Sequence, residues 1–215
     1  MTPLQSLRRY WSALGLVSAL VAGVCLITAW NEIGVLRTLL LLNFIVVLLH
    51  QFEECMWPGG FPAVANSVLL PSLNLDRFMH PLNRNSSMAA NLTFAYGFYL
   101  LPAVFPDVIW LGLAPVLVGL IVQFVGHAVY VNMKIRSFYS PGVATTVFGH
   151  VPIGAIYVYY ILANNLVSTL DWVLAIVYMS IALFLIFYII EQRLLGDEDS
   201  PYAFDDDELN RYTVE

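Results

Sequence analysis

Residues 38–57 read TLLLLNFIVVLLHQFEECMW, a run that is apolar for most of its length and ends in a cluster of polar side chains. An α-helix needs about 20 predominantly apolar residues to cross the hydrocarbon core of a bilayer. The run is continuous and does not alternate, which excludes a strand of a membrane β-barrel. It therefore predicts a transmembrane helix that carries ionisable groups near one end.

The composition of the whole chain agrees with this interpretation. Over 215 residues, hydrophobic side chains make up 60% and charged side chains 11%, against about 45–50% and 25% in typical globular proteins. So few charged side chains cannot cover the surface of a soluble domain of this size. Soluble enzymes, disordered proteins and nucleic-acid-binding proteins are therefore excluded, and the lipid bilayer is the partner that the composition predicts.

Six apolar runs of suitable length can be drawn along the chain. Only helices or closed barrels satisfy their backbone groups in lipid, so all six are expected to be helices. We expect an all-α membrane protein, with a six-transmembrane-helix bundle over residues 1–195 and an acidic cytoplasmic tail over residues 196–215. The first run is expected to stay uncleaved, because it is longer than the apolar part of a signal peptide. The runs are Trp11–Trp30, Thr38–Trp57, Met88–Phe105, Val108–Asn132, Val143–Asn164 and Leu170–Ile190.

Basic residues are distributed unequally between the two ends of these helices. Arg37 falls on one side, and the other side holds Arg8, Arg9, Arg77, Arg84, Lys134, Arg136, Arg193 and Arg211. Cytoplasmic loops carry the excess of Lys and Arg, so both termini are expected in the cytoplasm. Much of the net charge of −6 comes from acidic residues of the tail, and such a run is typical of a solvated, mobile segment.

Ionisable side chains inside a span cost about 2.5–3.5 kcal/mol each on insertion scales, so each needs a partner or a purpose. The second to fifth spans contain such side chains or polar amides, whereas the first and sixth carry scattered hydroxyls. At 100° per residue, Glu53 and Glu54 flank His50 on one face of the second helix, one turn further along. The residues singled out in this way are His50, Glu53, Glu54, Asn91, His127 and His150.

These polar residues also agree in depth. At 1.5 Å per residue, His50 and Glu54 lie roughly 5–10 Å from the cytoplasmic end of their helix, and Asn91, His127 and His150 roughly 5–12 Å from the ends of theirs. Unrelated polar residues would be scattered in depth. The coincidence predicts one polar site, built from four helices, in the cytoplasmic leaflet.

Three kinds of chemistry suit such a site. Histidine and carboxylate ligands bind divalent metals such as Zn, Fe or Mn, whose charge would offset the buried carboxylates. Without a metal, a glutamate could activate water opposite a histidine. The same residues could instead relay protons or ions across the membrane without covalent chemistry. A purely structural polar network is the remaining alternative.

Three segments of the membrane core stand out as motifs. They are His50-Gln-Phe-Glu53-Glu54 with Trp57-Pro58-Gly59-Gly60-Phe61, then Gly126-His127 with Asn132, then Tyr139-Ser140-Pro141-Gly142-Val143-Ala144-Thr145. In this order, with Asn91 between them, they resemble the integral membrane family named for its HxxEE motif. The resemblance implies a membrane enzyme whose reaction and substrate are not settled. It also implies site residues at His50, Glu53, Glu54, Asn91 and His127, whereas His150 rests mainly on its depth.

We therefore expect a metal-dependent membrane enzyme that acts on a lipid-like or amphiphilic substrate at the cytoplasmic leaflet. His50, His127 and His150 would hold the ion with one of the two glutamates, for which we take Glu54, and zinc is favoured over iron or manganese. The other glutamate would act as general base on water, and Asn91 would orient the substrate or a ligand. Hydrolysis is favoured because a glutamate is available as base, whereas iron would indicate oxidation.

Other classes of function remain open at this point. A metal-free site of Glu, His and Asn, similar in logic to the CAAX-prenyl-protease family, is the nearest enzymatic alternative. A proton-coupled small transporter or channel would need polar residues that continue into the outer half, where Asn43 is the main one. In an assembly or chaperone subunit, the acidic tail would be the docking segment. The turn Pro58–Phe61 and the loop beside it are expected to cover a lateral entrance to the site.

Overall fold

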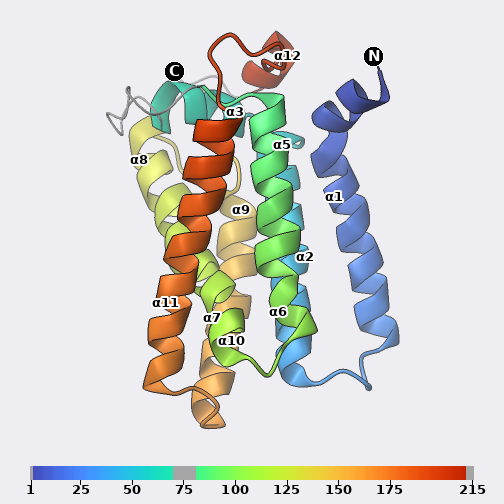
Figure 1. The fold of residues 1–215 in the computed structure, drawn as a ribbon, viewed down its shortest axis with the longest axis vertical. Helices are drawn as coiled ribbons and strands as arrows, with labels where there is room; N and C mark the ends of the chain where they lie inside the picture. The colour runs from blue at the N-terminus through green and yellow to red at the C-terminus, as the bar shows by residue number, and fades with distance from the viewer. Residues whose placement is uncertain (1, 70–80, 212–215) are drawn as a thin grey trace.

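The computed structural model describes residues 2–69 and 81–211 of the chain, and the regular elements within these residues are all helical (Figure 1). Arg77, one of the basic residues counted above, lies outside the described residues. Five helices are long and apolar enough to cross a membrane, which is consistent with a multi-pass integral membrane protein. The expected all-α architecture is therefore confirmed.

Three of the five long helices include segments in which the backbone hydrogen bonds follow a π-helical pattern, marked η. The five helices are α1 (Pro3–Thr28), α2 (Val35–Cys55), the run of α7 (Ile109–Leu117), η3 (Val118–Val131) and α8 (Asn132–Ile135), the run of α9 (Val143–Thr145), η4 (Thr146–His150) and α10 (Val151–Ala163), and the run of α11 (Thr169–Leu183) and η5 (Phe184–Leu194).

The remaining expected span, Met88–Phe105, coincides with three shorter segments. They are α5 (Arg84–Leu92), η2 (Thr93–Tyr99) and α6 (Leu101–Val104). The helix is interrupted at Leu100, and Pro102 just beyond it lacks the amide hydrogen that a regular turn would use. This segment is therefore not among the five long helices. The other short elements are α3 (Phe61–Val64), η1 (Ala65–Leu69) and α12 (Asp206–Leu209).

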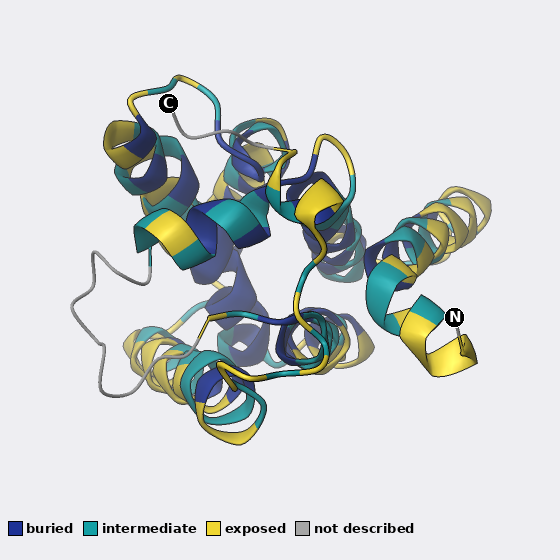
Figure 2. Ribbon diagram, turned by 90° about the horizontal axis from the view of Figure 1, so that it is seen from above, coloured by how far each residue is buried: buried dark blue, intermediate teal, exposed yellow. Residues whose placement is uncertain are grey.

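Helix α2 has a central place in the bundle, since it contacts α1, α7, α10, η2 and η4. Figure 2 shows buried faces turned toward the interior and exposed faces turned outward, most clearly on α1. Residues such as Leu20, Val24 and Ile27 on α1 are exposed apolar side chains. Lipid would cover these outward faces in a membrane.

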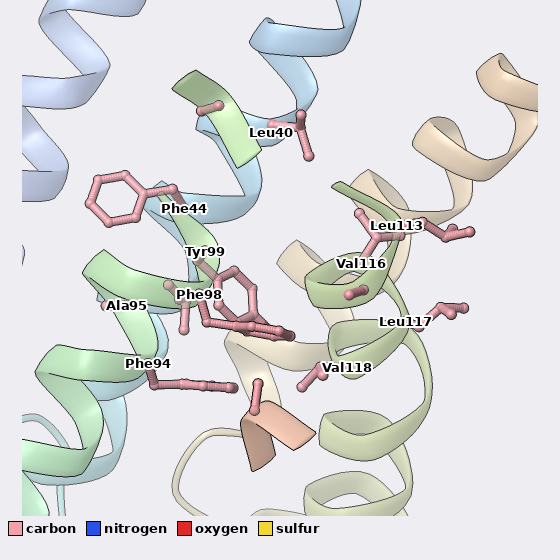
Figure 3. Packing of buried hydrophobic residues seen from close by; sticks show 14 of the residues in the cluster. Leu40, Phe44, Phe94, Ala95, Phe98, Tyr99, Leu113, Val116, Leu117 and Val118 are labelled. Carbon is pink, nitrogen blue, oxygen red and sulfur yellow. The ribbon is translucent and has the colours of Figure 1, made fainter. Parts of the chain in front are cut away.

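Three aromatic side chains of η2 pack against one another in the core of the bundle. Phe94 and Phe98 stack with ring centroids 5.5 Å apart, and Tyr99 meets Phe94 edge-on at 5.0 Å. Figure 3 shows these rings reaching from η2 toward Val116 and Val118 of the neighbouring helix. Such interlocking side chains pack helices together where apolar burial from water is not available as a driving force.

The acidic tail packs against the end of the bundle where α1 and α5 begin (Figure 1). Arg9 donates to Asp205 at 2.8 Å and to Asp207 at 2.7 Å. Arg84, at the start of α5, pairs with Asp205 and with Glu208 of α12. The described part of the tail is thus bound to the bundle, in contrast to the solvated segment that its composition indicates.

Further contacts fix the tail in place along its length. The backbone N–H of Arg84 donates to the carbonyl oxygen of Tyr202 at 2.9 Å, and the guanidinium of Arg8 lies 4.0 Å from the centre of the Tyr202 ring. Near the end of the described chain, Arg211 Nη1 donates to the carbonyl oxygen of Met56 at 2.8 Å. The tail therefore connects the beginnings of α1 and α5 with the end of α2.

We expect the substitution Arg84→Ala to release the tail. Arg84 is 17% exposed at its side chain and binds two carboxylates, and hydrogen bonds to charged groups contribute about 1.5–3 kcal/mol each. Hydrogen–deuterium exchange of residues 200–211 should accelerate about tenfold or more. Lys134→Ala removes a cation whose ammonium lies 5.7 Å from the Tyr130 ring and should leave the tail unchanged. Equal exchange in both variants would contradict the role given to Arg84.

The ion pairs also predict how the tail responds to acid. Hydrogen bonds and charge from Arg84, with a smaller contribution from Arg9, lower the pKa of Asp205 from its usual 3.8. A carboxyl group with a lowered pKa stabilises the bound tail above its ordinary pKa, and that contribution is lost as pH falls through the lowered value. Anisotropy of a dye at the C-terminus should therefore stay constant from pH 7 to about pH 4 and fall only below it. Release near neutral pH would refute this account.

Candidate metal centre

His50 and Glu54, one turn apart on α2, meet His127 of η3 in the interior of the bundle. The three residues are 1%, 6% and 5% exposed, respectively. Glu54 Oε1 lies 3.5 Å from His50 Nε2 and 3.2 Å from His127 Nε2. The structure thus brings together three side chains that the sequence analysis assigned to one layer of the membrane.

The other nitrogen of each imidazole indicates where its proton lies. His50 Nδ1 is 3.1 Å from the carbonyl oxygen of Gly142, and His127 Nδ1 is 2.9 Å from that of Pro141. His50 Nδ1 also lies 3.0 Å from Thr145 Oγ1. A backbone carbonyl only accepts hydrogen bonds, so these contacts favour the tautomer that carries its hydrogen on Nδ1. In the neutral rings both Nε2 atoms then present lone pairs, and both face Glu54 Oε1.

Three lone-pair donors that face one another repel unless a proton or a metal ion lies between them. Within the described residues, His50 Nε2 is buried without a hydrogen-bond partner. Tetrahedral coordination at zinc places neighbouring ligand atoms about 3.3 Å apart, close to the 3.2 and 3.5 Å found here. Metal-binding histidines commonly donate their other N–H to a carbonyl, as both do here. The group His50, Glu54 and His127 could therefore hold a metal ion.

Glu53, the neighbour of Glu54 in the motif, binds the segment 139–145 instead. Its Oε2 accepts hydrogen bonds from the backbone N–H and the hydroxyl of Thr145, at 2.8 and 2.5 Å. Its Oε1 accepts from the Ala144 N–H and the Tyr139 hydroxyl, both at 3.1 Å. Both oxygens of this carboxylate are thus engaged by one short stretch of chain.

The segment that Glu53 holds passes directly over the two imidazole rings. Gly142 adopts φ +94°, a left-handed conformation that favours glycine. A Cβ at this position would lie 2.7 Å from His50 Cε1 and 2.9 Å from His127 Nδ1. Gly142 therefore allows the backbone to come close enough for its carbonyl and that of Pro141 to accept from the rings.

His150 of η4 lies beside this group and is not part of it. Its Nδ1 is 3.0 Å from Asn43 Oδ1, and its ring centroid is 5.7 Å from that of His50. The set of ligand atoms within 4.8 Å of one another comprises His50, Glu54 and His127. Asn91, the expected orienting residue, donates from Nδ2 to the carbonyl oxygen of Ser87 at 2.9 Å.

A cavity of about 320 Å³ opens beside Glu54 and His127. Its lining combines polar side chains, including Gln51 and Asn91, with apolar ones from several helices. Phe61, at the start of α3, borders the same space with its ring centroid 5.4 Å from that of His127. The cavity, whose walls are both polar and apolar, is thus lined by four of the expected residues, His50, Glu54, Asn91 and His127, and not by Glu53 or His150.

Two further residues line this cavity that the sequence analysis missed. Glu191 and Gln192 of η5 are 7% and 2% exposed. The expected span Leu170–Ile190 ends one residue before Glu191. The helix continues to Leu194, and one more turn would have brought the carboxylate into the predicted polar layer.

We expect Gly142→Ala to weaken metal binding without removing a ligand. The added methyl group meets both imidazole rings, and loss of outer hydrogen-bond partners typically costs 10–100-fold in metal affinity. Zinc titration of protein in detergent, with competition by a chromogenic chelator, measures the change. Gly23→Ala is the matched control, because a Cβ there meets nothing within 4 Å. Equal zinc affinity in both variants would show that the close approach of Gly142 is unimportant.

Comparisons with known proteins concern this same region. Residues 41–157 match the HXXEE family, described as "Protein of unknown function with HXXEE motif". The match spans more than half of the chain and includes His50, Glu53, Glu54, His127 and Gly142. No curated protein and no solved structure matches the chain. The resemblance drawn from the motifs is thereby confirmed, and the chain belongs to the HXXEE family.

Proposed function

We propose that this protein is a metal-dependent membrane hydrolase that acts on a lipid-like substrate at the cytoplasmic leaflet. One observation carries the proposal: two imidazole Nε2 atoms, each with its Nδ1 facing a backbone carbonyl, converge on one oxygen of a buried glutamate. Such a set of donors suits a divalent metal ion, which His50, Glu54 and His127 would hold.

The proposal includes a bundle of six spans with both termini in the cytoplasm. Residues 84–104 would form the span that the five long helices leave out, the third along the chain. They extend over about 31 Å at 1.5 Å per residue, and their η2 and α6 parts pack on α2. Charge supports the orientation, because Arg9, Arg84 and Arg211 gather at one end with the tail. In this topology residues 1–195 are the membrane domain and residues 196–215 a cytoplasmic segment.

The ligands would be His50, Glu54 and His127, with zinc favoured over iron or manganese for histidine and carboxylate donors. When bound, such an ion supplies Lewis-acid polarisation of a substrate oxygen or of water. His150, expected as a fourth ligand, would instead support the His50 ring from the side, where it binds Asn43.

The site residues around this centre would have separate roles in proton transfer, in positioning segment 139–145 and in orienting the substrate. Glu54 is the glutamate of the motif that lines the cavity, so we assign it the proton-accepting role as well as a ligand role. Glu53, whose oxygens hold Thr145 and its neighbours, would position the segment 139–145. Asn91 borders the cavity and would orient the polar part of the substrate.

The turn Pro58–Phe61 would cover the entrance to the cavity, as the sequence suggested. Gly59 and Gly60 adopt φ of 77° and 96°, which directs Phe61 back toward His127. Cavity walls that are partly apolar suit a substrate that arrives from within the leaflet. Hydrolysis is preferred to oxidation because a glutamate lies at the centre to accept a proton.

We expect the reconstituted protein to cleave an ester, amide or phosphodiester bond in a panel of long-chain amphiphiles, with products identified by mass spectrometry. Glu54→Gln should reduce the rate about 100-fold or more, since it removes a ligand and the proton acceptor. A chelator should abolish turnover and zinc should restore it. Glu32→Gln, an exposed carboxylate beyond the end of α1, is the control. Cleavage that survives both chelator and Glu54→Gln would refute the mechanism.

A proton-coupled transporter remains the second candidate, and one feature favours it. Polar atoms without hydrogen-bond partners within the described chain continue beyond His50: His150 Nε2, Asn43 Nδ2, Tyr99 Oη and Tyr157 Oη. Such atoms are where buried waters bind, and a chain of waters would conduct protons. Substrate-dependent proton uptake into liposomes, in protein that cleaves no member of the panel, would favour transport over hydrolysis.

A further inference from the structure

Glu191 is the acidic residue of the cavity that the proposed chemistry leaves unused. It is 7% exposed, lines the same chamber as Glu54, and comes from η5. Within residues 2–69 and 81–211, no hydrogen bond or ion pair to a protein group involves its carboxylate. A buried carboxylate without a partner is costly, so such a group marks a place where a ligand supplies one.

The charge of the chamber limits what that ligand can be. Its lining contains the carboxylates of Glu54 and Glu191, and among the described residues no lysine or arginine lines it. Beside Glu191, away from the proposed metal ligands, a phosphate or sulfate group would meet a carboxylate and no basic side chain of the described residues. An ammonium group brings a positive charge and several N–H donors to a carboxylate, which is the complementary arrangement.

A second cavity, of about 310 Å³, continues from the first and is almost entirely apolar. It lies between η3 and η5 and shares Phe94, His127 and Phe187 with the first. Val122 on its wall is 39% exposed, so the cavity reaches the face of the bundle that lipid would cover. Its shape and lining suit a hydrocarbon chain that enters from the membrane.

We propose that the two cavities together bind a single-chain amphiphile with an amine head, its ammonium group on Glu191 and its chain between η3 and η5. This inference rests on the proposed function, because it names the substrate class of the same site. The ammonium group pairs with the carboxylate inside the bundle, and the chain replaces lipid contacts with Val122, Phe187 and their neighbours.

Gly126 provides a direct way to close the apolar cavity. It lines that cavity on η3, and a Cβ at this position meets nothing within 4 Å. Gly126→Leu therefore fills the space of the chain without a backbone clash. Gly23→Leu is the matched control, since Gly23 is also a helical glycine with an open Cβ position and lies on α1, outside both cavities.

Native mass spectrometry of protein released from maltoside micelles tests the proposal with three probes of equal chain length: hexadecylamine, hexadecanol and hexadecyl phosphate. The unaltered protein should retain the amine about tenfold or more tightly than either other probe. Glu191→Gln should abolish the preference for the amine and leave hexadecanol binding unchanged. Gly126→Leu should weaken amine and alcohol about tenfold or more, and Gly23→Leu should change neither.

Three results would overturn the proposal: phosphate bound as tightly as amine, a preference for amine that survives Glu191→Gln, or chain binding that survives Gly126→Leu. The comparison of the three head groups uses the unaltered protein, so it tests the preference for an amine even where a variant fails to fold. Metal content is measured on the same samples. Loss of the amine preference in metal-loaded protein refutes this inference alone, whereas metal-free protein that prefers the amine refutes the metal-dependent function.

Discussion

Two hydrogen bonds, from His50 to the carbonyl of Gly142 and from His127 to that of Pro141, are the constraint on which the candidate site depends. They favour hydrogen on Nδ1 of each ring, which in the neutral rings places both Nε2 lone pairs toward Glu54. With the opposite tautomer, each Nε2–H would donate to the carboxylate and the group would be a self-contained hydrogen-bond network. The two backbone carbonyls thus leave the Nε2 atom of each ring to bind either a proton or a metal ion.

The two adjacent glutamates of the motif make different contacts from the same turn of α2. Neighbouring residues of a helix project about 100° apart, so Glu54 reaches His127 while Glu53 reaches the segment 139–145. Glu53 holds that segment by four hydrogen bonds, and the segment in turn holds the rings. The cavity beside the candidate site is lined by the carboxylate of Glu191 on η5, and an apolar cavity between η3 and η5 extends it. Such a chamber suits an amphiphile.

Much of this arrangement could be predicted from the sequence, for physical reasons. Long apolar runs identify transmembrane helices because lipid leaves the backbone few alternatives, and agreement in depth brought His50, Glu54 and His127 into one layer. Depth alone could not separate His150 from the group of His50, Glu54 and His127, because it says nothing of the direction in which a side chain projects. The role of Glu53 required the path of segment 139–145, and Glu191 was missed because hydropathy falls at the end of a helix before the helix itself stops.

Elemental analysis of detergent-purified protein, never exposed to a chelator or to a metal-affinity column, tests the central claim most directly. The account predicts close to one equivalent of zinc, or of iron or manganese in its place, in the parent protein. The metal should be absent from Glu54→Gln and His50→Ala, and reduced in Glu53→Gln, which loosens the positioning segment and spares the ligands. A parent protein without metal, or a Glu54→Gln variant that keeps its full complement, would contradict the account.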